Sequence, residues 1–113
     1  MTAEIRSNLH EIASLCQKYS LKRLWLFGSA TDAEHGRFDA ESDYDFLIEI
    51  DRLAHPFHGW NDPVILLPGE LGDLLGRRVD VLEWTDVKDD VLQAALLASR
   101  ELVYENAGIE VTR

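Results

Sequence analysis

The N-terminal part of the chain has the hydrophobic spacing of an amphipathic helix. Between Ala3 and Tyr19, apolar residues recur three or four positions apart and so share one helix face. These residues are Ile5, Leu9, Ile12, Cys16 and Tyr19. Thr2 lies just before the first turn, where its hydroxyl can cap the helix. The pattern predicts one helix over residues 3–19 and a short connection over 20–23.

Three short apolar runs are typical of buried strands. They are Leu24 to Phe27, Asp43 to Ile50 and Val79 to Trp84. Runs of four to eight residues bounded by glycine or charged residues favour strands over helices. Between the first two runs, the sequence predicts one helical turn over residues 30–34 and a polar loop over 35–42. Another loop is expected over residues 51–62.

Two more helices are expected in the second half of the chain. The first runs from near Pro68 to Leu75 and ends at Gly76, because glycine commonly terminates a helix. The second is capped by Asp86 and continues to near Arg100. Its inward side chains are expected to be Val87, Val91, Leu92, Ala95 and Leu96. A short apolar segment, residues 102–104, follows this helix.

The order of these elements predicts the fold class. Helix, strand, polar loop, strand, helix, strand and helix make a small α/β (α+β) layer structure, with helices packed on one face of a mixed sheet. A chain of 113 residues is one domain and can bury a core without disulfides. We therefore expect a single domain over residues 1–113.

Composition and charge narrow the classes of function. The net charge is −10 and the pI is about 4.6, which disfavours a nucleic acid as substrate because nucleic-acid binding depends on neutralising phosphates. No apolar run approaches the roughly 20 residues of a membrane span. Cys16 is the single cysteine, which excludes an internal disulfide and fits a cytoplasmic protein.

The second strand separates its acidic residues from its apolar ones. Side chains alternate between the two faces of a strand. Tyr44, Phe46, Ile48 and Ile50 therefore share a face that must lie on the core. Asp43 and Asp45 share the opposite, open face, together with Leu47 and Glu49. In the third strand Asp80 points away from Val79 and Val81, so it can join the acidic pair if the two strands are neighbours.

Three such carboxylates predict chemistry with metal ions and phosphates. Asp43, Asp45 and Asp80 would repel one another unless a cation were present, and carboxylate oxygens are ligands that Mg²⁺ prefers. Two such ions can activate an attacking oxygen and neutralise a departing pyrophosphate. Gly28 lets the backbone approach a phosphate closely, and the Ser29 hydroxyl adds a donor. Each feature taken singly is more often a turn or a solvated strand end.

The motifs together resemble those of a known superfamily. "LWLFGSA" followed by "ESDYDFLIEI" is similar to the Gly-Ser and Asp-x-Asp signature of the DNA polymerase β nucleotidyltransferases. "LGDLLGRRVDVLE" resembles the segment that carries their third aspartate. The likeness runs from about Leu21 to Tyr104, and without an added domain the chain looks like a minimal nucleotidyltransferase, or MNT domain.

The resemblance implies a fold and a reaction. It implies a polymerase-β-like mixed sheet flanked by helices, two Mg²⁺ ions and a nucleoside triphosphate, with ATP as the expected substrate. A nucleoside monophosphate would pass to a hydroxyl group with release of pyrophosphate. Gly28 and Ser29 would hold the triphosphate. Asp43 and Asp45 would bind both metals, and Asp80 would bind the catalytic metal and help deprotonate the acceptor.

The resemblance also suggests a partner. Minimal members are similar to antitoxins that pair with small helical HEPN toxins, and some of them adenylylate a tyrosine of the toxin. We therefore expect a hetero-oligomer with a HEPN-type protein. Two alternatives stay open. The chain could be an antitoxin that blocks its partner by contact alone, or it could transfer a nucleotide to a small molecule.

One departure from the family pattern bears on these alternatives. Many relatives carry an arginine shortly after Gly-Ser, whereas this chain has Ala30, Thr31 and Asp32. Asp32 would repel phosphate, which favours the contact-only alternative, and Arg37 is the nearest basic substitute. The intact Asp43, Asp45 and Asp80 favour the enzyme.

Other residues have simpler interpretations. His55 and His58 lie three positions apart in a loop, where a two-histidine metal site is less expected than a flexible segment. Trp60 is interpreted as a packing anchor, with stacking on a base or a partner as the alternative. Arg77 and Arg78 are expected to be solvated, or to meet a phosphate. Cys16 is expected in the core.

Overall fold

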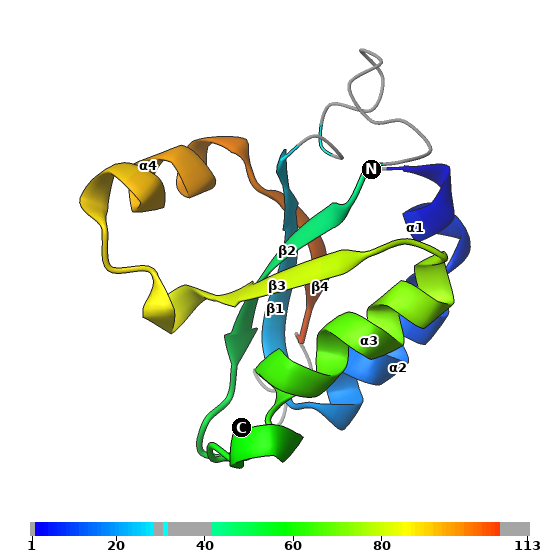
Figure 1. Cartoon of the computed structure of the whole chain (residues 1–113), viewed down its shortest axis with the longest axis horizontal. Helices are drawn as coiled ribbons and strands as arrows, with labels where there is room; N and C mark the ends of the chain where they lie inside the picture. Colours follow the sequence, from blue (N-terminus) through cyan, green and yellow to red (C-terminus); the bar gives the residue numbers. More distant parts are fainter. Residues whose placement is uncertain (1, 29–30, 32–41, 107–113) are drawn as a thin grey trace.

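The chain folds around a four-stranded mixed sheet (Figure 1). The computed structural model describes residues 2–28, 31 and 42–106. Within this part of the chain the strands are β1 (Leu21–Phe27), β2 (Tyr44–Ile50), β3 (Val79–Glu83) and β4 (Glu101–Glu105), in the spatial order β3-β2-β1-β4. β2 and β3 are parallel, and β1 is antiparallel to both β2 and β4. The predicted mixed sheet is confirmed.

Three helices cover one face of the sheet. They are α1 (Ala3–Ser7), α2 (Leu9–Lys18) and α3 (Pro63–Leu75), which lie side by side in Figure 1. Their apolar side chains, among them Ile12 and Leu67, enclose the main core against Tyr44, Phe46 and Ile48 of β2. The prediction that this alternate set of β2 residues faces the core is therefore correct.

The other face of the sheet is also partly covered, which corrects the expectation of helices on one face. α4 (Asp90–Ser99) packs there, and Leu96 joins Trp25, Leu47 and Val87 in a second, smaller core. Leu47 lies on the face that we expected to be open, yet it is fully buried. The physical reason is that both faces of the central strands carry apolar side chains, and each face needs a cover.

The N-terminal helix is interrupted, where the spacing predicted one continuous helix. Thr2 caps α1 as expected, since its hydroxyl accepts from the Ile5 amide at 3.3 Å. At Asn8 the backbone leaves the helical region, with φ −118° and ψ 18°, and the Asn8 side chain donates to the Glu4 carbonyl at 2.8 Å. Asparagine readily competes for backbone groups in this way and interrupts regular helix.

The helix α3 begins five residues earlier than expected. Asp62 caps it by accepting from the Val64 amide at 3.2 Å, and Pro63 occupies the first turn, where a missing N–H costs nothing. Pro68 lies inside the helix. An interior proline costs about 3 kcal/mol. Leu67 and Leu71, which are fully buried, offset this cost at about 1.5–3 kcal/mol each. Gly76 ends the helix with φ 69°, as expected.

Three further boundaries differ from the predictions. β1 begins at Leu21, which pairs with Ile50, so the expected connection over residues 20–23 is mostly strand. The last helix is capped by Asp89, whose carboxylate accepts from the Leu92 amide at 2.9 Å, whereas Asp86 lies in a preceding 3₁₀ turn. Val91, expected to point inward, is 79% exposed. In the described residues no helix is long and apolar enough to cross a membrane.

Candidate active site

The strand register brings Asp45 and Asp80 together. In the parallel pairing of β2 and β3 these two residues are direct partners. On the other side of β2, Phe27 is the antiparallel partner of Asp45. A line across the sheet therefore contains Phe27, Asp45 and Asp80, and we call its two aspartates the acidic row. Tyr44, which pairs with Val79, points into the core on the opposite face. The second and third strands are neighbours, so the condition under which Asp80 can join the acidic pair is met.

Asp43 lies at the entrance to this row, one residue before β2. Its Oδ2 atom is 3.9 Å from Nε of Arg78, which itself is exposed. The backbone holds this entrance to the start of β3, since the Tyr44 amide donates to the Arg78 carbonyl at 3.0 Å. Arg78 is therefore solvated, as expected, and supplies one positive charge at the edge of the acidic row, while its contact with a phosphate stays a prediction.

The acidic side chains affect one another electrostatically. Burial raises the pKa of Asp45 above its usual value, and the nearby charges of Asp80 and Asp43 raise it further. Because its neighbours are also negative, the ionised form of Asp45 would be stabilised strongly by a cation that neutralises the three carboxylates. This donor set of hard oxygens therefore fits a divalent ion such as Mg²⁺.

The arrangement is not a complete, preformed metal site. Among the residues that the structure describes, no three His, Cys, Asp or Glu side chains are grouped closely enough to hold an ion together. Asp45 and Asp80 are adjacent, whereas Asp43 lies toward Arg78. Binding of a metal by Asp43, Asp45 and Asp80 stays a prediction.

Gly28, directly after β1, packs closely against the carboxylate of Asp45. Its φ angle is +77°, which side chains disfavour, and a Cβ atom at this position would lie 2.9 Å from Oδ2 of Asp45. The backbone can therefore come this close to the carboxylate only because residue 28 is glycine. The hydroxyl of Thr31 donates to the Gly28 carbonyl at 2.8 Å. Ser29, Asp32, Arg37 and the expected turn over residues 30–34 fall outside the described residues, apart from Thr31.

A buried polar network behind the row was missed by sequence reasoning. Arg77, which we expected to be solvated, is instead largely buried: its Nε donates to Glu4 at 2.8 Å and its Nη1 to the Ser42 carbonyl at 3.0 Å. Glu4 also accepts from the Tyr44 hydroxyl at 2.5 Å, and Thr2 lies 2.6 Å from that hydroxyl. Burial and the neighbouring Glu4 raise the pKa of Tyr44 to about 12.

This network joins three segments that carry or flank the acidic row. It links the first helix to the residue before Asp43 and to the loop before β3. No local signal could have revealed it, because Glu4 and Arg77 are far apart in the sequence and both belong to residue types that are usually solvated.

The remaining candidates have structural roles or no shared site. Cys16 is buried in the core as expected, and burial raises the pKa of its thiol to about 12. His55 and His58 stack edge to face with ring centroids 5.3 Å apart. Glu49 accepts from Arg23 on the sheet surface and is not near the acidic row. Trp60 is 84% exposed, so it is not a packing anchor in this fold.

Fold and site together define a class of protein. The fold is a small mixed sheet with helices. Its site has two aspartates on adjacent parallel strands and a glycine packed against one of them, an arrangement suited to binding metal ions and phosphates. The family described as polymerase beta, nucleotidyltransferase, matches residues 10–108, which is most of the chain. The chain therefore belongs to this nucleotidyltransferase family.

Solved structures agree on the fold. A putative minimal nucleotidyltransferase is 24% identical, with a TM-score of 0.66 over 86% of this chain and 90% of that one. A toxin–antitoxin complex with AMP-PNP contains a chain that is 19% identical, with a TM-score of 0.66 over 89% and 76%. No curated protein matches the sequence.

A third structure carries a covalent nucleotide mark. It is a tri-AMPylated HEPN toxin of Shewanella oneidensis in complex with an MNT antitoxin, and the matching chain is 18% identical, with a TM-score of 0.61 over 94% of this chain and 76% of that one. These likenesses establish the polymerase-β-like fold of the minimal nucleotidyltransferases.

Proposed function

We propose that this chain is a Mg²⁺-dependent nucleotidyltransferase that transfers AMP from ATP to a hydroxyl group of a partner protein. The observation that carries the proposal is the pairing of Asp45 with Asp80 across β2 and β3, with Gly28 packed against Asp45. Membership of the nucleotidyltransferase family supports the reaction class. The toxin–antitoxin complexes among the similar structures support a HEPN-type toxin as the partner, with this chain as its antitoxin.

Each site residue has a role in this proposal. Asp43 and Asp45 would hold two Mg²⁺ ions, and Asp80 would help to hold one of them. When bound, these ions supply positive charge that stabilises the developing negative charge of the transfer. The Gly28 backbone and the Ser29 hydroxyl hold the triphosphate. The Phe27 side chain, beside Asp45 in the same line across the sheet, excludes water from that side of the reacting groups.

The bond changes balance without another reactant. The acceptor hydroxyl oxygen forms a bond to the α-phosphorus of ATP, and its proton passes to the carboxylate of Asp80. The bond between the α-phosphorus and the oxygen that bridges to the β-phosphate breaks, and pyrophosphate leaves. Asp80 is exposed near the start of β3, so an acceptor hydroxyl can reach its carboxylate.

A contact-only antitoxin is the second candidate, supported by two observations. Asp32 follows Gly28-Ser29 in the segment where the family resemblance leads us to expect a phosphate-binding arginine, and no complete metal site is preformed in the described residues. In this alternative the partner is blocked sterically and remains unmodified. Transfer to a small-molecule acceptor is a third candidate.

The decisive experiment separates chemistry from contact. The chain is incubated with ATP, Mg²⁺ and the protein encoded by the neighbouring gene, and the partner's mass is measured. The parent should add roughly 329 Da per AMP, the mark left by attack on the α-phosphate. The variant carrying Ser29→Ala and Asp43→Asn should still co-purify with the partner, yet add no mass and give no protection in cells. Full protection by this double variant would exclude the catalytic antitoxin and establish the contact-only one.

A further inference from the structure

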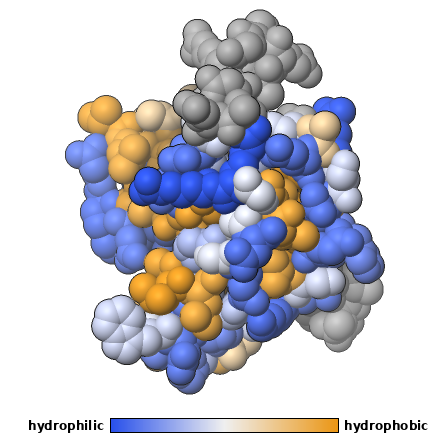
Figure 2. All heavy atoms as spheres, turned by 45° about the vertical axis from the view of Figure 1, so that its right-hand side comes forward, coloured by the Kyte–Doolittle hydropathy of each residue, from blue (hydrophilic) through white to orange (hydrophobic). Residues whose placement is uncertain are grey.

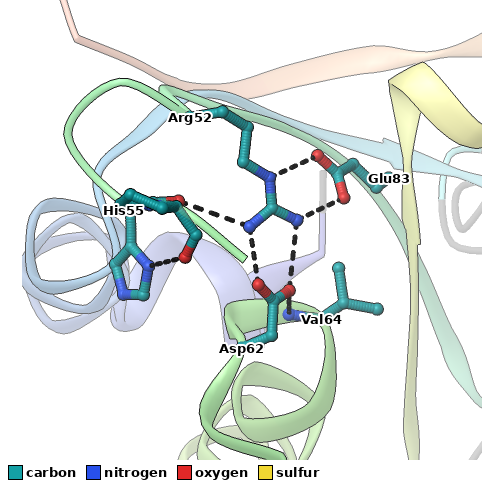
Figure 3. A network of polar contacts seen from close by, with 6 residues as sticks. Arg52, His55, Asp62, Val64 and Glu83 are labelled. Atoms are coloured by element: carbon teal, nitrogen blue, oxygen red, sulfur yellow. Dashed lines mark hydrogen bonds and ion pairs between the residues drawn. The ribbon is translucent and has the colours of Figure 1, made fainter. Parts of the chain in front are cut away.

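An ion-paired network fixes the loop that follows β2, at the end of the sheet away from the acidic row. Figure 3 shows the Arg52 guanidinium between two carboxylates. It contacts Asp62 through bonds of 2.6 and 3.1 Å and Glu83 through bonds of 2.6 and 3.1 Å. Asp62 and Glu83 are 1% and 4% exposed. Arg52 also donates to the His55 carbonyl at 3.4 Å, so the loop is tied to both α3 and β3.

This fixed loop exposes large apolar side chains. Leu53 is 98% exposed, Phe57 74% and Trp60 84%, and Ile65 on the first turns of α3 is also exposed. We call these four residues the apolar patch. Figure 2 shows that apolar side chains reach the surface at the lower end of the molecule, where Figure 1 places the start of α3. Gly59, with φ +63°, makes the bend that separates Phe57 from Trp60.

The patch borders a groove with an acidic rim. A hollow of about 360 Å³ runs between Phe57 and Ile65 on one side and Glu83 and Asp86 on the other. A smaller hollow of about 230 Å³ lies between Phe57, Trp60 and Ile65. The ionisable side chains that line the larger hollow are Arg52, Asp62, Glu83 and Asp86. Asp62 and Glu83 are buried and paired with Arg52, so among these four the exposed, unshared negative charge of the rim is that of Asp86, and the groove as a whole is net negative.

We infer that this groove and the apolar patch dock a protein partner that presents an apolar anchor flanked by lysine or arginine. Exposed aromatic residues around a pocket are typical of the energetic centre of an interface. The Arg52 network keeps the loop in one conformation, which reduces the entropy lost on binding. The acidic rim and the overall charge of −10 favour a basic partner and slow the approach of a second copy of this chain.

The inference rests on the proposed function, because the partner is the protein that receives the nucleotide. The docking surface and the acidic row are nevertheless separate. Asp45 is the second residue of β2 and Arg52 lies two residues beyond its end, and at about 3.3 Å per residue the strand from Asp45 to Ile50 alone spans on the order of 16 Å. Docking and transfer can therefore be abolished independently by substitution.

The test measures binding of the chain to the protein encoded by the neighbouring gene, by titration calorimetry. Phe57→Ser combined with Trp60→Ser should weaken binding at least about tenfold, since both side chains are exposed and their loss leaves the core intact. Val91→Ser combined with Leu97→Ser removes a matched pair of exposed apolar side chains from α4 and should leave binding unchanged. Mn²⁺ and nucleotide binding by the free chain should be the same for both variants.

A charge reversal tests the rim. Asp86→Lys should slow association several-fold at low ionic strength and much less at high salt, whereas Asp73→Lys, on the opposite end of α3, should not. Unchanged binding in the Phe57/Trp60 variant would overturn the inference, and so would failure of the parent to bind. Sedimentation that shows self-association through the patch would also overturn it. If the Phe57/Trp60 variant loses binding while the parent binds the partner but transfers no nucleotide, the transfer chemistry is refuted and the docking surface is still supported.

Discussion

Gly28 and Asp45 are in close contact across the first two strands, because the absent Cβ of Gly28 would lie 2.9 Å from the Asp45 carboxylate oxygen. The contact couples a backbone requirement to an acidic side chain. Residue 28 has to be small and has to tolerate a positive φ, while Asp45 has to remain beside Asp80. The end of β1 and the start of β2 are thus fitted to each other at the candidate active site.

Gly28→Ala should therefore damage activity more than stability. The new methyl group displaces the Asp45 carboxylate, and we expect AMP transfer to fall at least tenfold. The positive φ should cost about 1 kcal/mol of unfolding free energy. Gly76→Ala is the matched control, since it has a similar φ of +69° with no atom within 4 Å. It should lose similar stability and keep full transfer. Equal transfer by the two variants would show that the contact has no role in the reaction.

Asp45→Asn should fold, melt at or above the parent's temperature at neutral pH without metal, and lose transfer by at least about a hundredfold. The pKa of Asp45 is raised in the folded state, so ionisation of this group destabilises the fold above its unfolded pKa. The advantage of the variant should be present at pH 7 and disappear as the pH falls below about 4, where the aspartate is protonated in both states. Melting curves of both proteins from about pH 3.5 to about pH 8, a range that spans these values, measure this difference in stability. A variant that melts below the parent at neutral pH would show that Asp45 is structural.

Metal and nucleotide should bind cooperatively. The described residues supply only a partial metal site, and a nucleotide adds phosphate oxygens as further ligands. Calorimetric titration with Mn²⁺ should give weak binding alone and clearly tighter binding with a non-hydrolysable ATP analogue. The same titration of Asp45→Asn should lose this enhancement. An equal affinity with and without the analogue in the parent would argue against a shared site.

Arg52→Met should destabilise the fold strongly at neutral pH. The substitution leaves Asp62 and Glu83 buried without a counter-charge, and breaking a buried ion pair in this way costs about 3–5 kcal/mol. Burial acts to raise the pKa of Asp62, but hydrogen bonds from Arg52 and the Val64 amide outweigh it and lower the pKa. In the parent, the stability gained from this group is present above its unfolded pKa and is lost as the pH falls through the folded one.

The deficit of Arg52→Met should therefore shrink on acidification, as the orphaned carboxylates become protonated. Arg23→Met is the control, because Arg23 pairs with Glu49 and Glu105 on the surface of the sheet. An exposed pair of this kind contributes about 0–1 kcal/mol. Urea unfolding of both variants at pH 7 and pH 5 compares them. Equal, small losses at pH 7 would show that the Arg52 network does not hold the loop.

The sequence determined the features that depend on local alternation. The period of two in residues 43–50 placed Tyr44 and Phe46 on the core and Asp45 on the other face, because successive side chains of a strand point in opposite directions. Gly76 ended its helix, and Thr2 began another, for equally local reasons. The mixed sheet followed once these strands were recognised, whereas a metal site of Asp43, Asp45 and Asp80 stays a prediction.

Only the tertiary structure decided how distant segments meet. The register that pairs Asp45 with Asp80 depends on the whole β2–β3 connection, and α3 passes through Pro68 because its buried leucines outweigh the lost hydrogen bond. Arg77 was expected to be solvated and Arg52 falls in an expected loop, yet each is held by carboxylates that folding brings from other elements. A buried charge is stable only beside its partner, and a one-dimensional sequence does not record which partner comes into contact.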